Sequence, residues 1–146
     1  MPEEKVSSVL DKVVIVLSAG LMPGPAANIA SCIAAGLAAS SANQTGRSLV
    51  DATGLKSVAP SHLPIAILRA ESVAMSTLMK QLAGGAVMDG GILSLFPAYA
   101  QAIHEWGEYR HRHSQSAHAD ELMLGIGLAG PKRWVNRMTG SLPLWC

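Results

Sequence analysis

The stretch of sequence that decides the fold is VVIVL at residues 13–17, followed by Gly24-Pro25 and an alanine-rich run. A continuous β-branched segment is typical of a strand that is buried on both faces of a sheet. Proline favours the first turn of a helix, where no backbone N–H is needed. Residues at the spacing of one helical face follow: Ile29, Cys32, Ile33, Gly36 and Leu37. The sequence therefore predicts a strand, a loop and a helix.

The same alternation continues along the chain. Further strands are predicted at residues 65–68, 92–96 and 122–126, and further helices at residues 71–83, 98–112 and 131–139. A small hairpin is expected around Asp51 to Gly54. Strands that alternate with helices predict a three-layer α/β domain, with a mixed, mostly parallel sheet of about four strands and helices on both faces. We expect residues 1–146 to form one such domain.

The composition narrows the class of protein. Hydrophobic residues make up 49% of the chain and charged residues 14%, which excludes a disordered chain. A net charge of +1 gives no strong electrostatic case for a dedicated nucleic-acid-binding protein. The two cysteines, Cys32 and Cys146, are too few for a disulfide framework or a zinc site of thiolates, so a cytoplasmic location is expected.

A long uncharged stretch between Lys12 and Arg47 raises the alternative of a membrane protein. The leader Met1-Pro2-Glu3-Glu4-Lys5 is acidic, whereas a signal peptide begins with positive charge. Prolines at 23 and 25 interrupt the apolar run well before the ~20 residues that span a bilayer. We therefore expect no signal peptide, no anchor and no membrane partner.

Two segments resemble the first and last segments of type II peptidyl-tRNA hydrolases. The first runs from Lys12 through the strand to Gly24 and the helix as far as Ala35. The second comprises Leu124-Gly125-Ile126-Gly127, Gly130-Pro131 and Met138-Thr139-Gly140-Ser141-Leu142-Pro143-Leu144. The second is even more similar to an uncharacterised bacterial family thought to share that fold. Together they cover about a third of the chain, and the resemblance implies a peptidyl-tRNA hydrolase II-like fold.

The catalytic residues of the hydrolases do not carry over. These enzymes cleave the ester that links a peptide to tRNA, with a lysine, a glutamine and a histidine from their first loop and helix. An ungapped alignment places those positions on Ala27, Ser31 and Ala34. The acidic positions fall on Gly20 and on the pair Pro97-Ala98. None of these positions keeps the family's residue, so the resemblance implies the scaffold rather than the reaction, and no catalytic residue is named.

A ligand site is predicted beyond the carboxyl end of the first strand, where open α/β sheets bind their ligands. Ser18, Gly24, Asn28 and Ser31 lie there in sequence, beside helix-terminal N–H groups that favour anions. These residues are candidates to bind a small polar ligand or a nucleotide. An ordinary strand-to-helix turn with capping contacts is the alternative.

A small basic cluster on the last predicted helix is the candidate to contact phosphate. Lys132, Arg133 and Arg137 form it, and tRNA would be the corresponding partner. A solvated helix face is the alternative, which the low net charge favours.

The histidines are candidates for a metal site, and Cys32 is a candidate for a reactive thiol. His104, His111, His113 and His118 gather near Glu108, but positive arginines interleave them. A polar helix end is favoured over a metal site, so neither a metal nor a cofactor is expected. Cys32 lacks a basic neighbour in sequence and is interpreted as a small buried hydrophobe.

Three functions follow as hypotheses. The first is a ligand-binding or nucleotide-binding protein that has lost the hydrolase residues. The second is a divergent hydrolase of peptidyl-tRNA or a related ester, which would use Asn28, Ser31 or His104. The third is a structural homodimer without a ligand, and a homodimer is also compatible with the first two.

Overall fold

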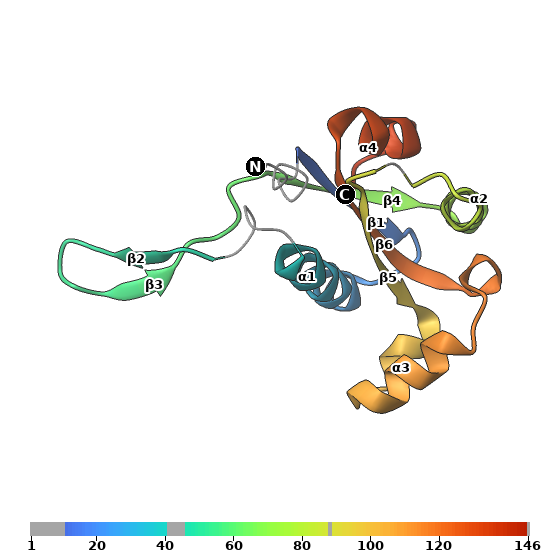
Figure 1. The fold of residues 1–146 in the computed structure, drawn as a ribbon, viewed down its shortest axis with the longest axis horizontal. Coiled ribbons are helices and arrows are strands. Elements are labelled where there is room, and N and C mark those ends of the chain that lie inside the picture. Colours follow the sequence, from blue (N-terminus) through green and yellow to red (C-terminus); the bar gives the residue numbers. More distant parts are fainter. Residues whose placement is uncertain (1–10, 41–45, 88, 146) are drawn as a thin grey trace, which may run out of the picture.

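A four-stranded mixed sheet forms the centre of the molecule (Figure 1). The computed structural model describes residues 11–40, 46–87 and 89–145. The strands are β1 (Lys12–Ser18), β4 (Ile65–Ala70), β5 (Ile92–Pro97) and β6 (Met123–Gly130), in the order β4-β1-β6-β5. β1 and β4 are parallel, whereas β6 is antiparallel to both of its neighbours, so it runs against the other three strands. The predicted mixed α/β sheet is confirmed.

The central strand β1 is buried on both faces, as its composition predicts. Its residues 13–17 are at most 1% exposed. Because side chains alternate along a strand, Val13, Ile15 and Leu17 enter one core cluster, while Val14 and Val16 enter the other. Each face of the sheet therefore has its own aliphatic core.

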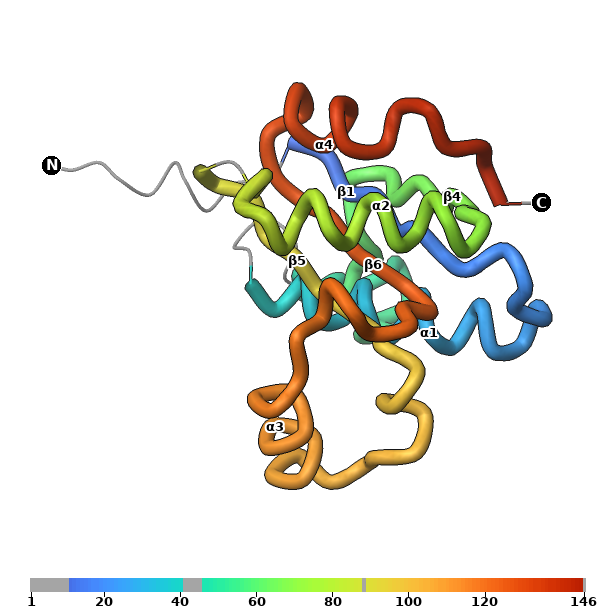
Figure 2. Tube along the Cα trace, turned by 90° about the vertical axis from the view of Figure 1, so that its right-hand side faces the viewer, coloured from blue at the N-terminus to red at the C-terminus, as the bar shows by residue number. Residues whose placement is uncertain are grey.

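Helices cover both faces of the sheet. The long helix α1 (Pro23–Ala39) packs on one face, and α2 (Ser72–Ala83) and α4 (Lys132–Thr139) pack on the other. In Figure 2, α2 crosses in front of the sheet and α1 lies behind it. Glycines of β6 allow α1 to lie close, since a Cβ at Gly125 would be 2.7 Å from Cδ1 of Ile33. The expected three layers are present.

A hairpin projects from the body between α1 and β4 (Figure 1). It consists of β2 (Ser48–Val50) and β3 (Lys56–Val58), which pair antiparallel. Asp51 closes the turn, because its carboxylate accepts hydrogen bonds from Thr53 N at 2.7 Å and from Leu55 N at 3.0 Å. The expected hairpin is confirmed, and residues 46–59 are called the arm below.

The single helix expected over residues 98–112 is wrong. The chain forms a short 3₁₀ helix, η3 (Ala98–Ala102), and then α3 (Trp106–Ser114), followed by η4 (His118–Asp120). Ile103 is extended, at φ −122° and ψ 117°, and interrupts the first turn. Glu105 then starts a new helix, because its carboxylate accepts the Glu108 N–H at 2.8 Å. This helix lies beyond the ends of the strands in both views.

The fourth strand is longer than predicted. It begins at Met123 and continues to Gly130, four residues past the expected end at Ile126. The sequence did not indicate this continuation because of the glycines at 125 and 127, since glycine is uncommon inside strands.

In the part of the chain that the structure describes, no helix is both long and apolar enough to cross a bilayer.

Candidate functional site

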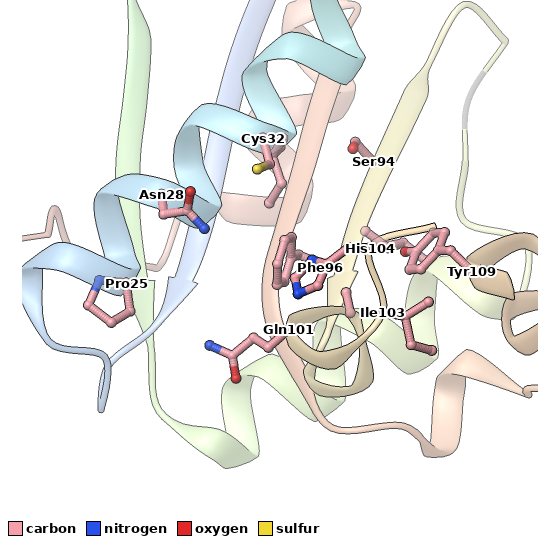
Figure 3. A pocket seen from close by; sticks show the side chains of 12 residues that line it. Pro25, Asn28, Cys32, Ser94, Phe96, Gln101, Ile103, His104 and Tyr109 are labelled. Atoms are coloured by element: carbon pink, nitrogen blue, oxygen red, sulfur yellow. The ribbon is translucent and has the colours of Figure 1, made fainter. Parts of the chain in front are cut away.

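A cleft of about 690 Å³ opens between α1 and the end of β5 (Figure 3). Its walls come from α1, from β5 and η3, and from the loop into α3. The lining residues are Pro25, Asn28, Cys32, Ile33, Ser94, Leu95, Phe96, Ala100, Gln101, Ile103, His104 and Tyr109. Small-molecule sites fall in this range of volume.

The α1 wall follows from helical spacing. Asn28 and Cys32 lie one turn apart, beside the buried face that packs on the sheet. Farther along the same side of the helix, a Cβ at Gly36 would lie 3.2 Å from Oγ of Ser94. The helix and the edge strand β5 are therefore in close contact next to the cleft.

Four polar side chains of the cleft are unpaired among the described residues. Among the described residues, the side chains of Asn28, Ser94, Gln101 and His104 make no hydrogen bond to another protein group. Figure 3 shows that the two amides come from opposite walls, Asn28 from α1 and Gln101 from η3. Each amide offers two N–H donors and a carbonyl acceptor. The cleft thus presents free donors and acceptors from both sides.

Apolar and aromatic groups complete the lining. Figure 3 shows the Phe96 ring beside His104 in the cleft, and Ile33 and Leu95 also belong to the lining. None of the lining residues is Lys, Arg, Asp or Glu. The site therefore offers a ring for stacking and neutral hydrogen-bonding groups, but no fixed charge.

The α3 wall is held by a stacked cluster, which comprises the rings of Tyr99, His113 and His118 and the guanidinium of Arg112. The hydroxyl of Tyr99 lies 2.7 Å from Nε2 of His118, and the two imidazole centroids are 4.1 Å apart. The Arg112 guanidinium stacks 4.1 Å above the Tyr99 ring. Tyr109 lies 5.8 Å from Tyr99, centroid to centroid, and reaches from this cluster into the cleft lining.

Burial shifts the titration of this cluster. Burial lowers the pKa of His118, the neighbouring His113 and Arg112 act in the same direction, and Glu121 opposes that shift. Burial also raises the pKa of Tyr99 and of Tyr109 above the ordinary phenol value. The His118 imidazole and the phenols of Tyr99 and Tyr109 are therefore favoured in their uncharged forms at neutral pH.

A sequence model of the family described as "Protein of unknown function (DUF2000)" matches residues 11–146. The chain belongs to this family. A search of curated proteins gives no match. Neither this family description nor the structural comparison links the DUF2000 chain to peptidyl-tRNA hydrolases.

A solved structure shares the fold. It is the protein of unknown function Atu0240 from Agrobacterium tumefaciens strain C58, with a TM-score of 0.80 and 17% sequence identity. The match covers 92% of the DUF2000 chain and 97% of that chain. At this identity the likeness shows the fold alone.

The predicted ligand residues separate in the DUF2000 structure. Asn28 lines the cleft. Ser31 is exposed beside it and donates its hydroxyl to the Ala27 carbonyl at 2.8 Å. Gly24 is exposed at the start of α1, with nothing within 4 Å of a Cβ placed there.

Ser18 lies on the other side of the sheet. It lines a separate pocket of about 60 Å³ together with Ser72 and Ser76 of α2. Because Ser18 has the same strand parity as Val14 and Val16, it faces the α2 side. The structure therefore does not bring Ser18 together with Asn28.

The interpretation of Cys32 as a buried hydrophobe is wrong. Its side chain is exposed and lines the cleft. The core face of α1 consists of Ile29, Ile33 and Leu37, and Cys32 lies beside it, where the cleft leaves it uncovered. Cys146 lies outside the described residues.

The histidines are distributed over several environments. His104 lines the cleft, His111 is exposed on α3, and His113 stacks on His118. Within residues 11–40, 46–87 and 89–145, no three His, Cys, Asp or Glu side chains are placed to hold a metal ion. His113 and His118 therefore serve to join α3 to η4 rather than to hold a metal.

The basic residues lie on the opposite face of the sheet from the cleft. Lys132, Arg133 and Arg137 are exposed on α4, which covers the face of the sheet opposite to α1. Lys12 lies beside them and donates from Nζ to Oδ1 of Asn136 at 2.5 Å. Their contact with phosphate stays a prediction that is independent of the cleft.

Several cleft residues were missed from the sequence. Phe96 ends the third predicted strand, and Gln101 and Tyr109 follow it, so the rule that ligands bind beyond strand ends applied to these three residues as well, whereas Ser94 lies within the strand. Their selection needed the strand order, which places β5 at the edge beside α1.

Proposed function

We propose that this DUF2000 protein binds a small, uncharged, polar molecule with a planar ring, of about nucleoside size, in the cleft between α1 and β5. The observation that carries the proposal is the set of unpaired polar side chains on both walls of that cleft. Function on this fold has to be argued from such a site, since a scaffold alone does not determine activity.

Size and lining chemistry support a planar ligand. A cleft of about 690 Å³ suits a molecule of one or two rings. The amides of Asn28 and Gln101 match the donor and acceptor edge of a nitrogen heterocycle, as amides do for nucleobases. The Phe96 ring supplies a face on which such a ring stacks.

The charge of the cleft favours a nucleoside over a nucleotide. A phosphate group calls for Arg, Lys or helix-terminal N–H groups. Among the described residues no Lys or Arg lines the cleft, and Pro25, which brings the first turn of α1 into the lining, has no N–H to donate. A dianionic ligand would therefore leave its charge without a counter-ion, whereas a neutral ligand would not.

The scaffold that we propose is of the peptidyl-tRNA hydrolase II-like kind, as the resemblance at the two ends of the chain suggests. The mixed four-stranded sheet is compatible with it. The hydrolase positions on α1 are occupied by Ala27, Ser31 and Ala34, none of which lines the cleft. Ligand binding therefore ranks above hydrolysis.

One observation keeps a hydrolase as the second candidate. The Cys32 thiol is exposed in the same cleft as His104. In such a pair the imidazole takes the thiol proton, and the sulfur attacks the ester carbonyl. The C–O bond then breaks, the imidazolium gives its proton to the leaving alkoxide, and water hydrolyses the acyl-thioester to release the acid and restore the thiol. Release of peptide from labelled peptidyl-tRNA by the protein, abolished by Cys32→Ser, would support this second function over the first.

The binding proposal is tested by calorimetric titration with free adenosine, guanosine, cytidine and uridine. We expect saturable binding of at least one nucleoside. Asn28→Ala and Gln101→Ala should each weaken it by roughly 2- to 12-fold, because each removes about 0.5–1.5 kcal/mol of hydrogen bonding. Ser31→Ala is the matched control, since Ser31 lies on α1 near Asn28 but outside the cleft. Absence of binding for all four nucleosides would refute the proposal.

A further inference from the structure

The arm projects from the body, and its apolar side chains are exposed among the residues that the structure describes. Every residue of β2 and β3 is exposed, and the hairpin stands away from the body in Figure 1. Its large apolar side chains are open to solvent: Leu49 is 48% exposed, and Val50, Leu55 and Val58 are 65–66% exposed. A two-stranded hairpin is marginally stable alone in water, and apolar surface of this kind marks interaction sites.

The outer edge of β2 is available for pairing. Ala59 N donates to the Arg47 carbonyl at 2.8 Å, and Asp51 N donates to the Leu55 carbonyl at 3.0 Å. Arg47 and Asp51 therefore direct their backbone groups toward β3, and Ser48 and Val50 direct theirs to the other edge. Among the described residues no strand pairs with that edge, which makes it a template for another chain.

We propose that the arm joins two copies of this chain: β2 of one copy pairs antiparallel with β2 of the other, about a two-fold axis at Leu49. In this register Ser48 of each copy exchanges backbone hydrogen bonds with Val50 of the other. Leu49 lies opposite Leu49 across the axis. The four strands of the two arms then form one continuous sheet.

Charge complementarity favours a second copy of this chain as the partner of the arm, and it favours the pairing centred on Leu49. With Leu49 on the axis, Arg47 of each copy lies opposite Asp51 of the other, so two opposite-charge pairs flank the central leucines. An axis at Ser48 would place Arg47 opposite Leu49, and an axis at Val50 would place Asp51 opposite Leu49. Only the proposed centre pairs both charges.

Asp51 is prepared for this pairing by its own turn. Hydrogen bonds from Leu55 N and from Thr53 hold the pKa of Asp51 below its usual value. The carboxylate is therefore ionised and held in place at the tip of β2. The turn that shapes the arm also fixes the charge that Arg47 of the second copy would meet.

The size of the arm determines how strongly two copies of the chain should associate. A standard interface buries ~800 Å² on each partner from about 20–30 residues. Residues 46–59 would supply roughly half of that, about 400–500 Å² per copy, which is the size of a weak and reversible contact. The arm therefore predicts a dimer that dissociates on dilution.

Sedimentation velocity over a range of concentrations tests the association. We expect the unmodified chain to shift from monomer to dimer as its concentration rises. Leu49→Asp and Arg47→Asp should each lower the association constant at least tenfold. Val73→Asp is the matched control, because Val73 is 77% exposed on α2 and lies outside the arm. A monomer at every concentration, or equal loss with the control, would overturn the proposal.

Disulfide trapping tests the register. Opposed residues outside the hydrogen-bonded pairs have Cα atoms about 4.5 Å apart, within the range of a disulfide. In a Cys32→Ser, Cys146→Ser background, Leu49→Cys should give a covalent dimer on mild oxidation. Ser57→Cys is the control, since Ser57 lies opposite Leu49 on β3, one strand away from the axis. Equal crosslinking of both variants would contradict the β2–β2 pairing.

Discussion

The hydroxyl of Tyr99 lies 2.7 Å from Nε2 of His118 and joins η3 to η4 across the base of α3. This contact matters for the cleft because η3 and the loop into α3 form one of its walls. α3 itself contributes no buried residue, so contacts of this kind, rather than a hydrophobic core, hold the wall in place.

The wall should loosen in acid. Burial lowers the folded-state pKa of His118, so the folded protein binds this proton less readily than the unfolded chain does. The stability that neutral His118 contributes to the folded wall is present above the unfolded pKa of about 6.5, and it is lost as the pH falls through the lower folded pKa. We expect amide protection of residues 99–121 to fall between about pH 7.5 and about pH 5.5, after correction for intrinsic exchange.

Two controls accompany the hydrogen-exchange measurement. Protection of β1 in the same sample should change less, because β1 lies in the buried sheet. In His118→Gln the acid-dependent loss should shrink, because the titrating group is gone. An unchanged pH dependence in that variant would show that His118 is not the group responsible.

The close packing of α1 on β6 predicts a sensitive glycine. A Cβ at Gly127 would overlap the Ile33 side chain and lie 2.9 Å from Cδ1 of Leu37. Gly127→Ala should therefore lower the free energy of unfolding by about 1–3 kcal/mol. Gly20→Ala, where nothing lies within 4 Å, should change it by no more than about 0.5 kcal/mol. Denaturant unfolding measures both, and equal effects would contradict the packing.

The packing of helix α4 on the sheet depends on one buried tryptophan. Trp134 is fully buried, and its indole N–H donates to the Ala86 carbonyl at 2.7 Å. Trp134→Ala should lower the free energy of unfolding by about 3–5 kcal/mol. Trp106→Ala removes a side chain that is 70% exposed and should cost less than about 1 kcal/mol. Thermal melts that rank the two variants in the opposite order would refute this assignment.

The exposed Cys32 predicts rapid labelling of the native protein. In a Cys146→Ser background, a thiol reagent should react with one thiol at a rate close to that of the unfolded chain. A nucleoside that occupies the cleft should slow this reaction, because Cys32 is part of its lining. Protection of Cys32 in the free protein would contradict its exposure.

Much of the fold could be predicted because the sequence repeats one simple pattern. The β-branched run at residues 13–17 and the apolar spacing along α1 and α2 identify buried elements without any knowledge of their neighbours. The hairpin was predictable from its turn residues, of which Asp51 makes the decisive bonds. The break at Ile103 was not, since the N-cap role of Glu105 competes with a helical pattern that passes through it.

The site was less predictable than the fold. Asn28 was found because ligands gather at strand ends, but the same rule selected Ser18, which strand alternation turns to the opposite face. Gln101 and His104 enter the cleft through a 3₁₀ turn and an irregular loop, for which sequence periodicity carries no signal. Cys32 was misjudged because its neighbour Ile33 is buried while the cleft exposes Cys32 itself.

The central claim is that the cleft between α1 and β5 binds a neutral planar ligand. A two-dimensional NMR titration of the isotope-labelled protein with guanosine and adenosine tests it most directly. The account predicts saturable shifts of the Cys32 and Ser94 amides, lost in an Asn28→Ala, Gln101→Ala double variant and retained in Ser31→Ala. Shifts confined to α4, or no shifts at millimolar nucleoside, would contradict it.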